Sequence, residues 1–484
     1  MTAWKDNVLI LCICLVAWGL SLPLRDSSCP PGWNYGSDTT TYLDLAANIQ
    51  SGKGYVHGPG AHYYGANIDG PNVSTYHNVH ILPGYPLLLV AGNWAVGPAR
   101  SPYAVAFLLF FLLMVCTFAM ARRLFGTVLP KRWLWIAFIL FFALQPIFIL
   151  QLQAIGRDLA STTFLTIYLY ALLVLFQRER AGFAVILATL AGLILAASVR
   201  TNIFAFLLPL LVGLVGYFGM THHSRKALIV AVNVAVAVAC ILAWGFYLRQ
   251  YTGRFLLGTD QGSSLYTNFI FPLAPPAEIR RDENAANALF QSEIKNGLSI
   301  EHAMADTSDF YHQRTIDYLH QHPSHLGPVT VKNIARTFWE KDYYWLPKLL
   351  YVKWRAGGLD RYEQFRAAFR NEHSRVVLAL FGAFYAICYL LYIAVPVVSL
   401  ILFPVIVGIR VIKSRSWAGS ALPETFFLAA GWALAALIFL GATSILGAAQ
   451  PRYRMPVAAV SYLSLLGILG WWRLRRGGHG NQIP

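Results

Sequence analysis

The sequence predicts an all-α polytopic membrane protein with about ten transmembrane helices and two large extracytoplasmic loops that carry short helices. Of the 484 residues, 57% are hydrophobic and 12% are charged, whereas soluble domains are typically about 25% charged. Lipid offers no partners for unpaired backbone groups, so apolar stretches long enough to cross a bilayer are expected to be helices. These stretches lie near 7–24, 102–121, 133–152, 159–176, 182–199, 202–220, 226–248, 376–409, 425–448 and 456–472.

Two of these stretches need a choice between readings. The amino-terminal run 8–22 has no small-x-small cleavage site, so we expect it to stay as the first span rather than act as a signal peptide. The stretch 376–409 is too long for one ordinary span and contains Pro396 and Pro404. We expect a tilted, kinked helix, or an interfacial helix leading into the span. Two full spans would put the basic residues 410–415 on the wrong side.

Lysine and arginine concentrate in four short connections and in the C-terminal tail, and with ten spans all five clusters fall on the same side of the membrane. The positive-inside rule makes that side cytoplasmic. Both termini are therefore expected in the cytoplasm, and both long loops outside it. Much of the formal charge of +16 follows from topology and gives no argument for nucleic acid. The basic residues are Arg122, Arg123, Lys131, Arg132; Arg178, Arg180; Arg225, Lys226; Arg410, Lys413, Arg415; and Arg473, Arg475, Arg476.

The first long loop contains a segment, 37–55, that predicts a short helix on the membrane surface. Asp38 stands where the helix would start, and Gly52 and Gly54 would end it. An apolar stripe at helical spacing lies between them, formed by Tyr42, Leu45 and Ile49. One interpretation of Asp38 is a helix N-cap alone, which contributes about 1 kcal/mol. The other is a carboxylate placed for chemistry at the membrane surface.

Four histidines in the same loop raise the question of a metal: His57, His62, His77 and His80. Their spacing fits no compact zinc pattern. Aromatic neighbours suit sugar stacking or interfacial packing equally well. A divalent metal is not favoured, and no cofactor is expected.

Arginines at the outer ends of spans break the usual charge bias. They are Arg200, Arg452 and Arg454. A guanidinium forks onto phosphate oxygens in a bidentate way, so a lipid phosphate is a natural partner. Alternatively, these arginines reach lipid headgroups or pair with carboxylates such as Asp158. Asp158 itself begins a span, where it is either a helix N-cap, a partner for Arg157, or a functional acid.

The second long loop mixes helical segments, around 285–296 and 309–320, with an aromatic and basic stretch from Trp339 to Trp354. Aromatic rings bind sugar faces and also anchor proteins at headgroups. We expect the loop to cap a cavity. Lys341 and Tyr344, from the aromatic stretch, would face that cavity.

These motifs together resemble the GT-C superfold of membrane glycosyltransferases, such as protein O-mannosyltransferases and lipid A aminoarabinose transferases. Asp38 and Tyr42 are similar to the ends of an Asp-Glu-x-x-Tyr motif, in which Thr39 here replaces the Glu. Three further stretches are similar to family motifs: the Pro-rich run 82–89, Arg157-Asp158 as a second acidic position, and 450–456 as an Arg-Tyr-x-x-Pro stretch.

The resemblance implies an inverting enzyme that moves a single sugar from a polyprenyl-monophosphate carrier to a cell-envelope glycan, glycolipid or protein acceptor. Asp38 would be the general base and Asp158 the second acidic residue. A pair of closely spaced carboxylates, as in retaining hydrolases, is not evident. We expect Arg200, Arg452, Arg454 and Lys341 to bind the phosphate, and Tyr42, Tyr85 and Tyr344 to contact the substrate.

The same reading divides the chain into three parts within an inner or plasma membrane. Residues 1–248 form an N-terminal transmembrane module whose first outer loop, 25–101, is catalytic. Residues 249–375 form an extracytoplasmic cap, and residues 376–484 form C-terminal transmembrane helices. The site would then lie on the extracytoplasmic, periplasmic face.

Two other functions compete with this one. An O-antigen ligase or polymerase would use a diphosphate-linked donor, and a secondary transporter also has many spans. Transporters usually show internal repeats and charges at mid-depth, whereas the notable charges here gather at the outer boundary. Transfer of a whole oligosaccharide to protein is disfavoured because the Trp-Trp-Asp motif of oligosaccharyltransferases is absent from the sequence.

Replacing Asp38 with Asn is expected to lower sugar transfer from a polyprenyl-monophosphate sugar by about 10²–10⁴-fold, the usual contribution of a general base. The measurement is the rate of transfer by purified protein. Transfer at the unsubstituted rate would remove Asp38 as the base.

Overall fold

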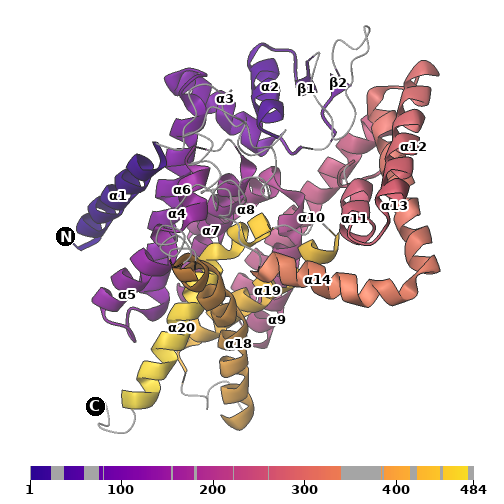
Figure 1. Ribbon diagram of the computed structural model, residues 1–484. Helices are drawn as coiled ribbons and strands as arrows, with labels where there is room; N and C mark the ends of the chain where they lie inside the picture. Colours follow the sequence, from indigo (N-terminus) through magenta and orange to yellow (C-terminus); the bar gives the residue numbers. More distant parts are fainter. Residues whose placement is uncertain are drawn as a thin grey trace.

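The computed structural model supports an all-α membrane protein (Figure 1). Apart from the short hairpin of β1 (Val56–His57) and β2 (Tyr76–His77), every regular element in the described part of the chain is a helix. Only the backbone is described at 2–3, 38–40, 150, 339, 445–446, 451–453 and 477. The described residues are 2–22, 38–58, 76–79, 81–153, 156–178, 182–221, 223–259, 261–339, 383, 386–414, 422–446 and 451–477.

Among these residues, 8 helices are long and apolar enough to cross a membrane. This count rests on length and composition, and it confirms the expected integral membrane protein. The helices are α1 (Thr2–Ser21), α4 (Ser101–Phe125), α7 (Arg157–Gln177), η4 (Thr201–Ile203) with α9 (Phe204–Met220), α10 (Ser224–Thr252), η6 (Leu390–Ala394) with α18 (Val395–Ser414), α19 (Glu424–Leu446), and η8 (Pro451–Val457) with α20 (Ala458–Gly477).

Two other predicted spans take a different form. The stretch 182–199 is α8 (Phe183–Val199), an apolar helix of 17 residues. The stretch 133–152 is divided into α5 (Lys131–Phe138), a π-helical turn η3 (Ile139–Ala143) and α6 (Pro146–Gln151). Proline lacks a backbone N–H and its ring clashes with the preceding turn, so Pro146 ends one helix and starts another. The two short helices that result are important for the site below.

The stretch 376–409 contains one long helix, described from Ala386 to Ser414. Pro396 and Pro404 lie inside it. The π-helical turn η6 comes just before Pro396, where a regular α-helix would press the proline ring against the carbonyl of residue 392. A single, irregular span therefore accounts for the described part of this stretch, and residues 376–382 lie outside it.

One end of the bundle gathers the basic connections. The carboxylate of Asp6, near the start of α1, lies 2.6 Å from Nη1 of Arg122 and 2.6 Å from Nζ of Lys131. At the start of α10, Nζ of Lys226 donates to the carbonyl oxygen of Phe176 near the end of α7, at 2.9 Å. In Figure 1 the lower ends of α18 and α20 also point away from α2 and α3. The buried Asp6 thus neutralises part of the charge that gathers here.

The opposite end carries the segments outside the long helices. The first long loop forms α2 (Asp38–Gln50), the hairpin and α3 (Gly84–Val96). The helix predicted from Asp38 is present, and Gly52 and Gly54, with φ of 76° and 90°, follow its end. The second loop forms α11 (Gln261–Phe269), α12 (Pro276–Lys295), α13 (Ile300–Gln321), η5 (Pro323–His325) and α14 (Leu326–Trp339).

A buried polar network fastens the hairpin to α2. The Oδ2 atom of Asp44 accepts from the backbone N–H of Gly58 at 3.0 Å and lies 3.2 Å from Nδ1 of His57. Nε2 of His57 lies 3.1 Å from Oδ1 of Asn78. Burial raises the pKa of the Asp44 carboxyl, but bonds from His57, Gly58 and Asn48 outweigh burial and lower this pKa below its ordinary value. Asp44 therefore stays ionised and holds the loop in place.

The start of α3 packs directly on the end of α8. A Cβ atom on Gly84 would lie 2.7 Å from the carbonyl oxygen of Ser198 and 2.8 Å from its carbonyl carbon. Backbone atoms cannot move aside as a flexible side chain can. Glycine at this position in the Pro-rich motif therefore lets two helices meet two residues before Arg200.

Gly84→Ala is expected to lower stability by about 1–3 kcal/mol, the usual cost of overpacking. Gly213→Ala in α9 is the matched control, because nothing lies within 4 Å of its Cβ position and alanine favours helix by about 1 kcal/mol. Apparent Tm in detergent measures both. A Gly84→Ala protein as stable as the Gly213→Ala protein would contradict the close contact.

Candidate functional site

A buried ion pair joins two helix ends at the end of the bundle opposite the basic connections. Asp158 lies in the first turn of α7, where the helix dipole favours a carboxylate. Arg200 directly follows α8, and its Nη1 donates to Oδ1 of Asp158. The two side chains are 4% (Arg200) and 10% (Asp158) exposed. Water screens such a pair poorly. Removal of either charge would therefore leave the other one buried without a partner.

The pair bears on two of the interpretations that the sequence left open. The N-cap of α7 is Gly156, so Asp158 is not a helix cap. Its carboxylate pairs with Arg200, an arginine 42 residues further along the chain. Of the two interpretations of Arg200, pairing with a carboxylate is what the described atoms show. Arg200 as a phosphate ligand stays a prediction.

Tyr85 and Tyr42 lie next to this ion pair. The backbone N–H of Gly156 donates to the Tyr85 hydroxyl. Burial and the charge of Asp158 raise the pKa of Tyr85, against the opposing effect of the Gly156 bond. The Tyr85 hydroxyl therefore stays neutral. The ring of Tyr42, in α2, meets the Tyr85 ring edge to face at 5.1 Å. Both rings are buried, so they pack against other groups of the protein.

The remaining predicted residues are placed only in part. The backbone of Asp38 begins α2, and residues four apart share a helix face, so position 38 is on the face that carries Tyr42. The side chain of Asp38 lies outside the described residues. The same is true of the side chain of Arg452, whose backbone is in η8, and of Lys341 and Tyr344 altogether.

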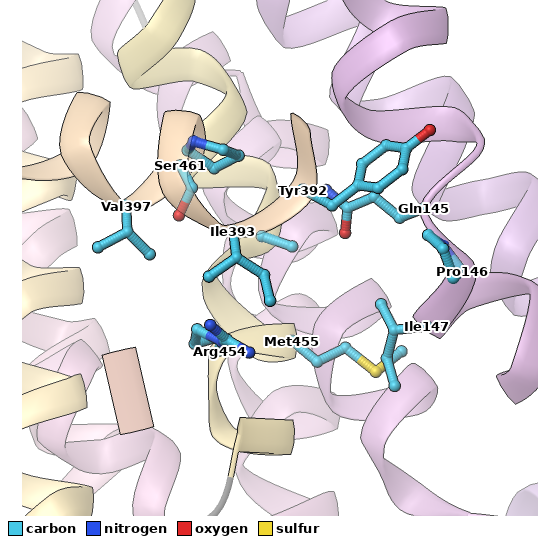
Figure 2. Close-up of a pocket in the computed structure, with 11 residues that line it drawn as sticks. Gln145, Pro146, Ile147, Tyr392, Ile393, Val397, Arg454, Met455 and Ser461 are labelled. Atoms are coloured by element: carbon cyan, nitrogen blue, oxygen red, sulfur yellow. The ribbon is translucent and has the colours of Figure 1, made fainter. Parts of the chain in front are cut away.

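Arg454 lies in the wall of a pocket between three segments far apart in the sequence (Figure 2). Its side chain belongs to η8, is 8% exposed, and donates from Nη1 to the carbonyl oxygen of Phe338 in α14 at 2.7 Å. Among the described residues of the lining, Arg454 is the one with a formal charge. The others, from α6, η6 with α18, and η8 with α20, are Gln145, Pro146, Ile147, Tyr392, Ile393, Pro396, Val397, Met455, Ala458 and Ser461.

The pocket and the ion pair belong to adjoining elements. The turn η8, which carries Arg454, packs against α7, which carries Asp158, and against α14. In Figure 2 the Met455 side chain extends toward Ile147 of α6, across the pocket from η6. Helix α6 then leads, through a short connection, into α7. A ligand in the pocket would therefore lie beside the element that holds Asp158.

Sequence reasoning missed the polar residues of this pocket: Gln145, Tyr392 and Ser461. A signal for Gln145 existed, since a polar residue followed by a proline inside an apolar stretch is unusual. Tyr392 and Ser461 carried none, because hydroxyl side chains are common in membrane helices.

The histidines of the first loop do not converge on a metal in the part that is described. Both ring nitrogens of His57 face Asp44 and Asn78, and the ring of His77 stacks on Tyr251 at 3.9 Å. Among described side chains, no three His, Cys, Asp or Glu residues gather to hold a metal ion. His62 and His80 lie outside the described residues.

Fold and site together define a polytopic membrane protein with a buried ion pair and a cationic pocket at one end. No family model matches the chain, and no curated protein matches its sequence. Among solved structures it is similar to the oligosaccharyltransferase AglB from Archaeoglobus fulgidus in complex with an inhibitory peptide and a dolichol-phosphate. The identity is 14%, with 99% of this chain and 53% of AglB covered and a TM-score of 0.47.

The chain is also similar to ArnT from Cupriavidus metallidurans bound to undecaprenyl phosphate, at 14% identity and a TM-score of 0.38. That match covers 95% of this chain and 78% of ArnT. The chain thus spans about half the length of AglB, at 53%. At TM-scores below 0.5 these likenesses concern the general arrangement of helices.

Arg200→Leu is expected to destabilise the protein by about 3–5 kcal/mol, because it leaves the Asp158 carboxylate buried without its partner. The double substitution Asp158→Leu and Arg200→Leu should be less destabilising than Arg200→Leu alone. Apparent Tm measures both.

Arg254→Leu is the control, because this side chain is 45% exposed and pairs with Asp306 and Asp309 at the surface. Such surface pairs contribute about 0–1 kcal/mol. If Arg200→Leu cost no more than Arg254→Leu, the pair would not hold the two helix ends together.

Proposed function

We propose that this chain is an inverting glycosyltransferase that moves a single sugar from a polyprenyl-monophosphate carrier to an acceptor outside the cytoplasm. The acceptor is a cell-envelope glycan, glycolipid or protein. The observation that carries the proposal is Arg454, a buried guanidinium in the wall of a largely apolar pocket. A polyprenyl phosphate is an anion attached to a long apolar chain, and it needs this combination of neighbours.

The apolar side of the pocket suits the isoprenoid. Ile393, Val397 and Met455 supply hydrocarbon surface from helices that are themselves long enough to cross a membrane. A tail held between α18 and α20 would stay in a lipid-like environment. The phosphate would then meet Arg454 at the outer end of these helices, since a guanidinium binds phosphate oxygens through parallel N–H bonds.

The proposed reaction is a single displacement. An acceptor hydroxyl attacks the anomeric carbon and gives its proton to the Asp38 carboxylate. The bond from that carbon to the phosphate oxygen breaks, and the phosphate leaves with the electron pair. Arg454 stabilises the charge that develops on the phosphate. Attack from the face opposite the leaving group inverts the anomeric configuration.

Asp158 and Arg200 support this chemistry from beside the pocket. The Arg200 guanidinium already faces a carboxylate, so Arg454 is the better candidate for the phosphate and Arg200 a secondary one. Asp158, fixed by Arg200, would orient the acceptor. Tyr42 and Tyr85 would hold α2, and with it position 38, against the start of α7. Arg452, Lys341 and Tyr344 stay proposed contacts for the phosphate and sugar.

The orientation in the membrane and the division of the chain belong to the same proposal. The end with Arg122, Lys131 and Lys226 would face the cytoplasm with both termini, by the positive-inside rule. Gln145 from the first proposed part and Tyr392 from the third share one pocket. Residues 1–248 and 376–484 would thus form one catalytic bundle, with 249–375 as its cap.

Arg454→Gln is expected to lower transfer by about 10²–10³-fold, the usual loss when one charge-stabilising donor is removed. Arg454→Lys should keep part of the activity, since it retains the charge and loses the bidentate geometry. The assay gives purified protein a panel of undecaprenyl-phosphate hexoses and pentoses with an envelope lipid extract. Release of undecaprenyl phosphate reports the reaction whatever the acceptor is.

Arg254→Gln is the matched control, because its guanidinium forms surface ion pairs in the outer helices. It should keep full activity. Full activity of Arg454→Gln, or activity with a diphosphate-linked donor alone, would overturn the proposed function.

A further inference from the structure

The side-chain carbonyl oxygen of Gln151, in α6, is buried and has no hydrogen-bond partner among the described residues. Gln151 is 3% exposed, and its Oε1 atom is buried without a donor. An unsatisfied polar atom in the interior lowers stability, and native proteins keep few of them. A leucine or methionine would fill the same volume without that cost. The glutamine therefore calls for an explanation outside the stability of the fold.

Gln151 belongs to α6, which contributes to the pocket, and faces the start of α7, which carries Asp158. Its Oε1 atom lies 3.7 Å from the position of a Cβ on Gly156, so the amide faces the N-cap of α7, a helix of 21 residues. Asp158 is in the first turn of that helix. In the other direction, Ile147 is four residues earlier and lines the pocket (Figure 2). Residues four apart share a face of a helix, so Gln151 is on the face of α6 that carries Ile147, one turn beyond the pocket lining.

The order of residues from the pocket along α6 to the start of α7 matches the order of groups in a glycosylated lipid, in which the sugar follows the phosphate. Arg454 and Ile147 line the pocket, Gln151 follows about one helical turn later, or about 5.4 Å, and Asp158 comes next. With the phosphate at Arg454, the attached sugar would extend along α6 toward the Gln151 amide. An amide carbonyl accepts a hydrogen bond and repels an anion, so it suits a sugar hydroxyl and disfavours a carboxylate or a second phosphate.

We propose that Oε1 of Gln151 accepts a hydrogen bond from a hydroxyl group of the sugar that the lipid donor carries. Gln151 is thus a specificity-determining residue for neutral, hydroxylated sugars. This inference rests on the proposed function. Sites that hydrogen-bond a substrate hydroxyl discriminate strongly against ligands that lack it, because the protein group is then left unpaired.

The test compares binding of undecaprenyl phosphate alone with binding of the same lipid bearing a single neutral hexose, over a panel of hexoses. The unsubstituted protein should prefer at least one hexose-bearing lipid. Gln151→Met should bind that lipid about tenfold more weakly, the loss of about one hydrogen bond. It should bind the bare lipid phosphate as before.

Apparent Tm separates this role from a structural one. Gln151→Met removes an unpaired oxygen at similar volume, so its Tm should equal or exceed that of the unsubstituted protein. Gln177→Met, at the basic end of α7, where Gln177 contacts Arg123, is the control. It should leave both lipid affinities unchanged.

Two results would overturn the inference, and they are distinguishable. If Gln151→Met keeps the full preference for the hexose-bearing lipid, the carbonyl serves packing or an ordered water alone, and the proposed function still stands. If the unsubstituted protein binds neither the bare nor the glycosylated lipid, the proposed function fails and this inference with it.

Discussion

The ion pair between Asp158 and Arg200 is the constraint on which one end of the molecule depends. Both charges are nearly excluded from water, so neither helix end can move away without leaving a buried charge unpaired. Other contacts gather around it. Gly84 brings α3 onto α8 just before Arg200, and Tyr85 bonds to Gly156 just before Asp158. A polar site beside lipid needs such fixed partners, because hydrocarbon offers none.

At both ends of the bundle, buried charges have fixed partners of opposite sign. At the basic end, the buried Asp6 carboxylate is held by Arg122 and Lys131, which reduces the repulsion between cations there. At the other end, cations and carboxylates meet in buried or half-buried pairs. The apolar middle of the long helices keeps these two sets of charges apart.

The pocket at Arg454 shows how an interrupted helix contributes to a site. Pro146 ends the π-helical turn η3 and starts α6, and Gln145, Pro146 and Ile147 all line the pocket. The opposite wall comes from η6, another π-helical turn beside a proline. Irregular backbone in membrane proteins is tolerated where it is buried in protein or lines a cavity. The two irregular turns and Arg454 therefore belong to one arrangement.

The sequence by itself determined the membrane class, the long apolar helices, the gathering of basic connections at one end and the helix that begins at Asp38. These features depend on composition and on neighbours within a few turns, so local physics suffices. It also singled out Asp158, Arg200 and Arg454. Only the tertiary structure decided that Asp158 and Arg200 pair, that Arg454 faces a pocket, and that the Gln151 amide faces the start of α7, because each contact joins separate segments.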